Sequence, residues 1–160
     1  MMDFSQITDE LYIGTTPRRG DYEMLRALGV QLVINMRFLR GRAPADGKPG
    51  MRYMRLRTAD NPLLPIPTEV FMRGTRAALY VMRGGGNVYI HCSRGRHRSV
   101  AMAAAILIAQ GRSPQEAMDL LKAQRTAADP DASHIQSRIL EFARRWSEAK
   151  PSKAAVNRQP

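Results

Sequence analysis

The sequence predicts an α/β fold with a central, mostly parallel sheet of about four to five strands and helices on both faces. Short apolar or alternating runs suited to strands take turns with longer segments of helical periodicity. The run Val30 to Met36 is apolar in the manner of a strand buried on both faces. With 160 residues, 44% of them hydrophobic, we expect one domain over residues 1–150 and a flexible polar tail over 151–160.

The first part of the chain predicts strands at Glu10–Gly14, Val30–Met36 and Met51–Arg57. Between the first two, Asp21 is expected to cap a short helix that stops at Gly29. Glycine, proline and aspartate make residues 38–50 a loop, and the prolines of residues 58–67 exclude a regular helix or a central strand.

The second part predicts a long helix from Thr68 to the glycines 84–86, and then a buried strand at Asn87–His91. The next helix, Ser99–Gln110, has almost no polar face, which indicates a central position. Two further helices follow. One has Ser113 as its cap, Pro114 at its first position and Glu116 as the partner in a capping box, and the other spans Ala132–Ser147.

Composition limits the classes of partner and cofactor. The net charge of +11 indicates an anionic partner or simply a soluble surface, and both remain open. A single cysteine excludes an intrachain disulfide and a multi-thiolate zinc site, and the three histidines lack metal-binding spacing, so we expect no metal and no cofactor. No signal peptide is visible, and the longest apolar stretch, Val100–Ala109, is about half a membrane span. We expect a cytoplasmic monomer without a membrane span.

The stretch NVYIHCSRGRHRSV, Asn87 to Val100, places the only thiol among arginines. Cys92 follows the predicted strand, and the loop after it contains Arg94, Arg96 and Arg98. A strand, a loop and then a helix is the arrangement in which backbone N–H groups and the helix dipole bind an anion such as phosphate or sulfate. The same groups would favour the nucleophilic thiolate of Cys92 over the thiol.

Two other loop residues fit phosphate binding. Arg98 lies six residues after Cys92, and its planar guanidinium can grip two phosphoryl oxygens. Gly95 allows the backbone to turn so that successive N–H groups converge.

This C-x5-R pattern, in the longer form HCSRGRHRS, resembles the signature of the cysteine-dependent protein tyrosine phosphatase superfamily, specifically its dual-specificity branch. The segments ITDELYIG and LGVQLVIN resemble the first two strands of that branch, and YMRLRTADN resembles the strand and loop that carry the general acid. The similarity extends over roughly residues 7–145.

The resemblance implies a tyrosine-phosphatase-like fold and a set of roles. Cys92 would be the nucleophile, Arg98 the phosphate clamp and His91 the residue that orients the loop and tunes the thiolate. Ser99 would donate a hydrogen bond to the sulfur and ease its departure from a phosphocysteine. The substrate phosphate would be held by the loop residues Ser93, Arg94, Gly95, Arg96, His97 and Arg98.

A general acid must protonate the leaving oxygen and then deprotonate the attacking water. Asp60 is the first candidate, because it lies 32 positions before Cys92 in a proline-stiffened loop, a spacing that resembles the family's. The rival is Asp129, which precedes Pro130, because another C-x5-R phosphatase family takes its acid from a late Asp-Pro pair.

The loop departs from the family at Arg94, where alanine is common, and Arg96 and His97 make it unusually basic. Their side chains either point into solvent or select a substrate with several phosphates. His134 is expected on a helix surface, and Arg125 either lies near the loop or is solvated.

Three functions follow from these patterns. The first is a phosphatase acting on phosphotyrosine, with or without phosphoserine and phosphothreonine, in a protein or peptide. The second is the same chemistry on a phosphoinositide or an RNA 5′ phosphate. The third is a non-catalytic module that binds phosphate or nucleic acid, which is not favoured because every catalytic residue type is present and no RNA-binding signature is visible.

Overall fold

The structure, a computed structural model, describes residues 2–39 and 50–149 and contains a five-stranded sheet in the order β1-β2-β5-β3-β4. The four parallel strands are β2 (Leu11–Gly14), β3 (Val30–Arg37), β4 (Arg52–Thr58) and β5 (Asn87–His91). Strand β1 (Phe4–Thr8) pairs antiparallel with β2 at one edge. The predicted α/β class and mostly parallel sheet are confirmed.

Strand β1 is the element that the sequence prediction missed. The segment ITDELYIG was expected to form a single opening strand, whereas the chain makes a hairpin whose turn contains Asp9 and Glu10. Only Ile7 of β1 is buried, so the strand has little of the apolar alternation that reveals strands in a sequence.

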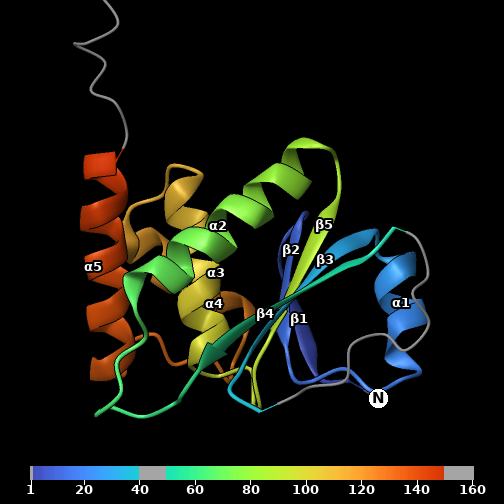
Figure 1. Ribbon diagram of the computed structural model, residues 1–160, viewed down its shortest axis with the longest axis horizontal. Helices are drawn as coiled ribbons and strands as arrows, with labels where there is room; N and C mark the ends of the chain where they lie inside the picture. The colour runs from blue at the N-terminus through green and yellow to red at the C-terminus, as the bar shows by residue number, and fades with distance from the viewer. Residues whose placement is uncertain (1, 40–49, 150–160) are drawn as a thin grey trace, which may run out of the picture.

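Helices cover both faces of the sheet, as predicted (Figure 1). On one face lies α1 (Asp21–Ala27), whose Tyr22 and Leu25 pack with residues of β2, β3 and β5 in a small apolar cluster. The other face carries α2 (Thr68–Arg83), α3 (Arg98–Ala109), α4 (Pro114–Gln124) and α5 (Ser133–Ala149) over the main core. None of the described helices is long and apolar enough to cross a membrane.

Helix α3 is central, in agreement with its apolar sequence. Residues 100–107 are at most 1% exposed, and α3 contacts α2, α4 and α5 as well as the sheet. Because a helix buried on all sides cannot easily shift, α3 gives the loop at its N-terminus a rigid base.

The helix starts differ from the sequence predictions in two places. Asp21 is the first residue of α1 rather than its cap, which is Gly20, and the Asp21 carboxylate instead accepts from the backbone N–H of Arg18 at 2.7 Å. Helix α3 begins one residue early, at Arg98. The predicted capping box of α4 is confirmed, since the side chains of Ser113 and Glu116 each accept from the other's backbone N–H. Most of the predicted 38–50 loop and the whole 151–160 tail lie outside the described residues.

Candidate active site

The loop between β5 and α3 lies at the carboxyl end of the parallel strands, where open α/β sheets bind ligands. Gly95 forms its turn with φ +62°, in the left-handed region that favours glycine. The loop passes close to the end of β2, so a Cβ at position 95 would lie 2.8 Å from the carbonyl carbon and oxygen of Gly14. Backbone shape and packing therefore both require glycine here.

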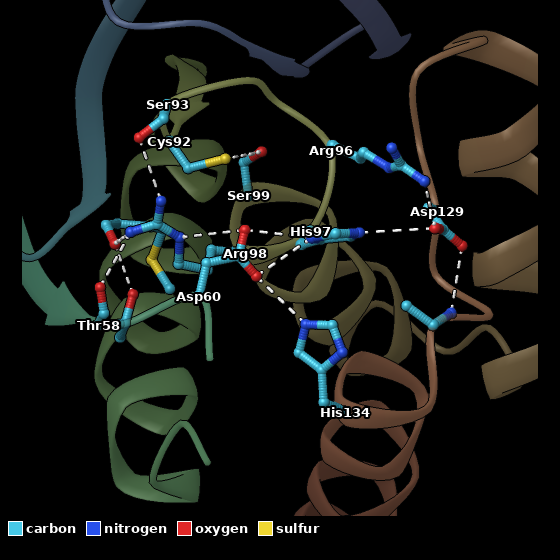
Figure 2. Close-up of polar contacts among 12 residues, drawn as sticks. Thr58, Asp60, Cys92, Ser93, Arg96, His97, Arg98, Ser99, Asp129 and His134 are labelled. Carbon is cyan, nitrogen blue, oxygen red and sulfur yellow. Dashed lines mark hydrogen bonds and ion pairs between the residues drawn. The ribbon is translucent and has the colours of Figure 1, made fainter. Parts of the chain in front are cut away.

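The Cys92 thiol lies at the base of this loop and is 2% exposed. Its Sγ is 3.3 Å from the hydroxyl oxygen of Ser99 (Figure 2). Burial alone would raise the pKa of Cys92, but hydrogen bonds from the Ser99 hydroxyl and from the backbone N–H groups of Ser99, Arg96 and Arg94 outweigh burial and lower that pKa. The site thus favours a thiolate.

The Arg98 guanidinium is fixed beside the loop by three acceptors. Its Nη1 donates to the carbonyls of Met36 (3.2 Å) and Thr58 (3.0 Å), at the ends of β3 and β4, and its Nη2 donates to the Ser93 hydroxyl (3.2 Å). Its Nε is buried without a hydrogen-bond acceptor among the described residues. The fork is therefore held in place with a donor still to satisfy, which suits binding of an anion.

Asp60 follows β4 and is contacted by two histidines. Both of its carboxylate oxygens lie 3.1 Å from His97 Nδ1, and Oδ1 lies 3.2 Å from Nε2 of His134 on α5 (Figure 2). Oδ2 is 4.0 Å from Arg98 Nε. Partial burial raises the pKa of Asp60. Hydrogen bonds from His134 and His97 and the charge of Arg98 lower that pKa by more than burial raises it, so the net shift is downward.

A pocket of about 170 Å³ opens above the thiol. Its lining residues are Asp60, Cys92, Ser93, Arg94, Arg96 and His97. Four of the predicted phosphate-binding residues thus line one cavity, while Gly95 supports the loop from behind and Arg98 lies beside Ser93.

Asp129 stands outside this lining. Its Oδ2 pairs with Arg96 at 2.9 Å and lies 3.5 Å from His97 Nε2, an ion-pair distance. Of the two carboxylates considered as general acid, the geometry therefore places Asp60 at the pocket and Asp129 behind two of its lining residues.

Arg94, Arg96 and His97 form the basic rim of the pocket, and their side chains were expected either to point into solvent or to contact the substrate. Neither expectation describes all three residues. Arg96 is half exposed but tied to Asp129, and His97 points toward Asp60 rather than into solvent. The side chain of Arg94 is exposed and has no acidic partner among residues 2–39 and 50–149. Arg94 is thus the rim arginine left available to a ligand.

Sequence patterns did not decide the position of Arg125, which is buried behind the loop at 3% exposure. Its Nε donates to the carbonyl of Gly95 at 2.8 Å, and its Nη2 donates to the carbonyl of Arg94 at 3.3 Å. The guanidinium also pairs with the Asp3 carboxylate, since Nη2 donates to Oδ2 at 2.8 Å and Nη1 donates to Oδ1 at 3.2 Å. Arg125 thus holds the carbonyls of Gly95 and Arg94 pointing away from the pocket, so that the N–H groups of the loop can face the pocket.

The two ring nitrogens of His91 are buried and have no hydrogen-bond partner among the described residues. Its ring stacks on Tyr89, with ring centroids 6.0 Å apart, and burial lowers its pKa to about 3, which keeps it neutral. The loop-orienting and thiolate-tuning role that the resemblance implies for His91 stays a prediction, and the contacts here are those of packing.

Comparison with known proteins agrees with this geometry. Residues 11–145 match the family described as the dual specificity phosphatase catalytic domain. The chain belongs to this family. The phosphatase is 29% identical over 130 residues to mouse dual specificity phosphatase 28, covering 80% of this chain and 77% of that one. It is also 32% identical over 168 aligned positions to rat phosphatidylglycerophosphatase and protein-tyrosine phosphatase 1, covering 96% and 81%.

A solved structure, PTPMT1 in complex with PI(5)P, superposes with a TM-score of 0.77 at 26% identity, covering 91% of this chain and 97% of that chain. The protein is accordingly a cysteine-dependent phosphatase, a hydrolase of the dual-specificity branch, as the loop signature predicts.

Proposed function

We propose that the phosphatase hydrolyses phosphomonoesters in two steps, with Cys92 as nucleophile. In the first step the thiolate attacks phosphorus, an S–P bond forms, and the bond to the leaving oxygen breaks as that oxygen takes a proton from Asp60. In the second step water attacks phosphorus and gives a proton to Asp60, and the S–P bond breaks to release phosphate. The observation that carries this proposal is the buried sulfur of Cys92, which receives hydrogen bonds from Ser99 and the loop N–H groups and whose pKa is lowered.

Arg98 and the loop amides would stabilise the equatorial oxygens of the transition state. The two carbonyls that hold Arg98 come from different strands, so the guanidinium is positioned before substrate arrives. Ser99 would act mainly in the second step, because its hydrogen bond stabilises the thiolate that leaves phosphorus.

The lowered pKa of Asp60 bears on its two roles differently. An ionised carboxylate is ready to act as the base of the second step, whereas the first step needs the protonated form. A bound phosphoryl dianion would raise the pKa of Asp60 by like-charge repulsion and so favour its protonated form. Substrate binding would thus convert Asp60 into the acid that the first step requires.

Phosphotyrosine, with or without phosphoserine and phosphothreonine, is the substrate class that family membership favours. A phosphoinositide is the second candidate, favoured by the unpaired Arg94 at the rim and by the similarity to PTPMT1, whose structure was solved with PI(5)P. Arg94 could pair with a second phosphate beside the one held in the loop.

The test compares kinetics of wild type, Cys92→Ser, Asp60→Asn and Asp129→Asn on a phosphotyrosine peptide and on PI(5)P vesicles. We expect no turnover from Cys92→Ser, a loss of about 10²-fold or more in kcat for Asp60→Asn, and a much smaller loss for Asp129→Asn. Unimpaired Asp60→Asn would refute the acid assignment. Replacing Arg94 by alanine should raise KM for the lipid more than for the peptide if the second candidate is correct.

A further inference from the structure

Asp60, His97 and His134, called here the Asp–His–His cluster, come from three separate elements: the loop after β4, the phosphate loop and α5. One ligand atom from each lies within 4.8 Å of the other two. Asp60 Oδ1 is 3.1 Å from His97 Nδ1 and 3.2 Å from His134 Nε2 (Figure 2). Since these residues are 37 and 74 positions apart, no sequence spacing reveals the cluster.

The spacing of these atoms suits a tetrahedral metal ion. Zn²⁺ binds histidine nitrogen and carboxylate oxygen at about 2.0–2.2 Å, which puts neighbouring ligand atoms of a tetrahedral site roughly 3.3–3.6 Å apart. The distances from Asp60 Oδ1 to the two histidine nitrogens, 3.1 and 3.2 Å, are within about 0.2 Å of the lower end of that range. The other oxygen, Oδ2, faces Arg98, so the carboxylate can serve the cation and the guanidinium through different atoms.

Asp129 supplies the outer contact that a metal-binding histidine needs. Its Oδ2 lies 3.5 Å from His97 Nε2. A carboxylate at the far nitrogen favours a proton there, so once Zn²⁺ displaces the proton on Nδ1, this nitrogen can present its lone pair to the metal. Asp129 also pairs with Arg96, which leaves Arg98 as the cation that most directly opposes a metal ion at this place.

We propose that the Asp–His–His cluster is an inhibitory site for Zn²⁺, with a water molecule as the fourth ligand. Binding displaces the protons that Nδ1 of His97 and Nε2 of His134 share with Asp60, and these protons leave to solvent. The inhibitory part rests on the proposed role of Asp60, because a carboxylate whose Oδ1 is bound to metal can neither give nor take a proton in catalysis.

Calorimetric titration of ZnCl₂ into Cys92→Ser at about pH 7.5, where free imidazole is mostly neutral, tests the site without the thiolate. We expect one Zn²⁺ per chain and an affinity that falls at least about tenfold when His134→Ala or His97→Gln is added. The matched control is Asp131→Asn, which removes an exposed carboxylate paired with Lys122 and should leave the affinity unchanged. Loss of binding in Cys92→Ser, or undiminished binding in either histidine variant, would overturn the proposal.

Two measurements on the unaltered chain remain decisive even if a variant does not fold. Co²⁺ should give the visible bands of a tetrahedral nitrogen–oxygen site without the near-ultraviolet band of a thiolate ligand. Sulfate bound in the loop offsets the charge of Arg98, so Zn²⁺ should bind at least as tightly with sulfate as without it. A thiolate band, or competition between sulfate and Zn²⁺, would place the metal on Cys92 and contradict the proposal.

Inhibition separates this site from the proposed function. Zn²⁺ should lower kcat on a phosphotyrosine peptide in wild type, and His134→Ala should shift the inhibition to at least about tenfold higher Zn²⁺. Binding at the cluster without inhibition would keep the metal site and refute Asp60 as the general acid. If Zn²⁺ inhibits His134→Ala at the same concentration as it inhibits wild type, the metal site is refuted, while the assignment of Asp60 as general acid stands.

Discussion

At the residue scale, the chemistry depends on how Cys92 is stabilised as a thiolate although it is buried. Desolvation works against the charge, and the balance is reversed by one side-chain hydroxyl and three backbone N–H groups. Since the His91 imidazole is neutral and its nitrogens have no hydrogen-bond partner among the described residues, the thiolate depends on hydrogen bonds from the loop and from the first turn of α3.

Replacing Ser99 by alanine should raise the pKa of Cys92, because it removes the hydroxyl 3.3 Å from Sγ. A hydrogen bond to a charged group is worth about 1.5–3 kcal/mol, which corresponds to an upward shift of about one to two pH units. The rate of alkylation by iodoacetate, measured against pH, reports the shift, and at neutral pH the variant should react more slowly.

Ser113→Ala is the matched control, since it removes a hydroxyl from the start of α4 instead. It should lower the free energy of unfolding by about 1 kcal/mol and leave the alkylation profile unchanged. An unshifted profile in Ser99→Ala would show that the hydroxyl does not stabilise the thiolate.

Site residues were predictable where they are neighbours in the chain. Cys92, Arg98 and Ser99 follow from a fixed spacing in one strand–loop–helix unit. The surroundings of Asp60 were not predictable, because His134 was expected on a helix surface and instead contacts Asp60 from a helix 74 positions away. The position of Arg125 depends likewise on tertiary contacts, with a loop 30 positions away.

At the element scale, the phosphate loop is held open from two sides. Arg125 binds its carbonyls from behind, and the end of β2 approaches so closely that only glycine fits at position 95. The loop is thus shaped in advance, and its N–H groups need no rearrangement to meet an anion.

Arg125→Met should lower both stability and anion binding, because it leaves the carbonyls of Gly95 and Arg94 without their donor. We expect the free energy of unfolding to fall by about 3 kcal/mol and the affinity for inorganic phosphate to fall about tenfold. Urea denaturation and calorimetry measure the two effects.

The matched variant is Asp3→Asn, which weakens the pair with Arg125 but keeps its bonds to the loop carbonyls. Because the Asp3 side chain is 67% exposed, we expect a change below about 1 kcal/mol and near-normal phosphate affinity. Equal losses in the two variants would mean that the pair with Asp3, rather than the loop contact, is what matters.

Element boundaries were predictable where local chemistry is strong. The capping box of α4 and the glycine end of α2 were found from sequence, whereas β1 was missed because only one of its residues is buried. Asp21 has the residue type of a cap, but its carboxylate binds the backbone of Arg18, before the helix, instead of the first turn.

At the scale of the whole molecule, the sheet order assembles the site. Strands β5, β3 and β4 are neighbours, and their carboxyl ends supply Cys92, the Met36 carbonyl and the Thr58 carbonyl with the adjoining Asp60. Arg98, at the start of the buried α3, joins all three strand ends. Sequence predicts that such strands exist but not their order, which depends on how the crossovers pack.

The net charge of +11 acts on the molecule as a whole. A positive surface should speed the arrival of a phosphoryl dianion, so raising NaCl should lower kcat/KM several-fold between low and physiological ionic strength. Turnover at saturating substrate should change little, because kcat does not depend on how fast the substrate reaches the site. A kcat/KM independent of salt would contradict steering by the overall charge.

The most direct measurement of the central claim is rapid-quench mass spectrometry of Asp60→Asn mixed with p-nitrophenyl phosphate. Because p-nitrophenolate leaves without a proton, the first step should proceed while the second, deprived of its base, should be slow. The account predicts a burst of p-nitrophenolate and a phosphoryl group on Cys92. A phosphoryl group on any other residue, or turnover with no phosphoenzyme in either Asp60→Asn or wild type, would contradict it.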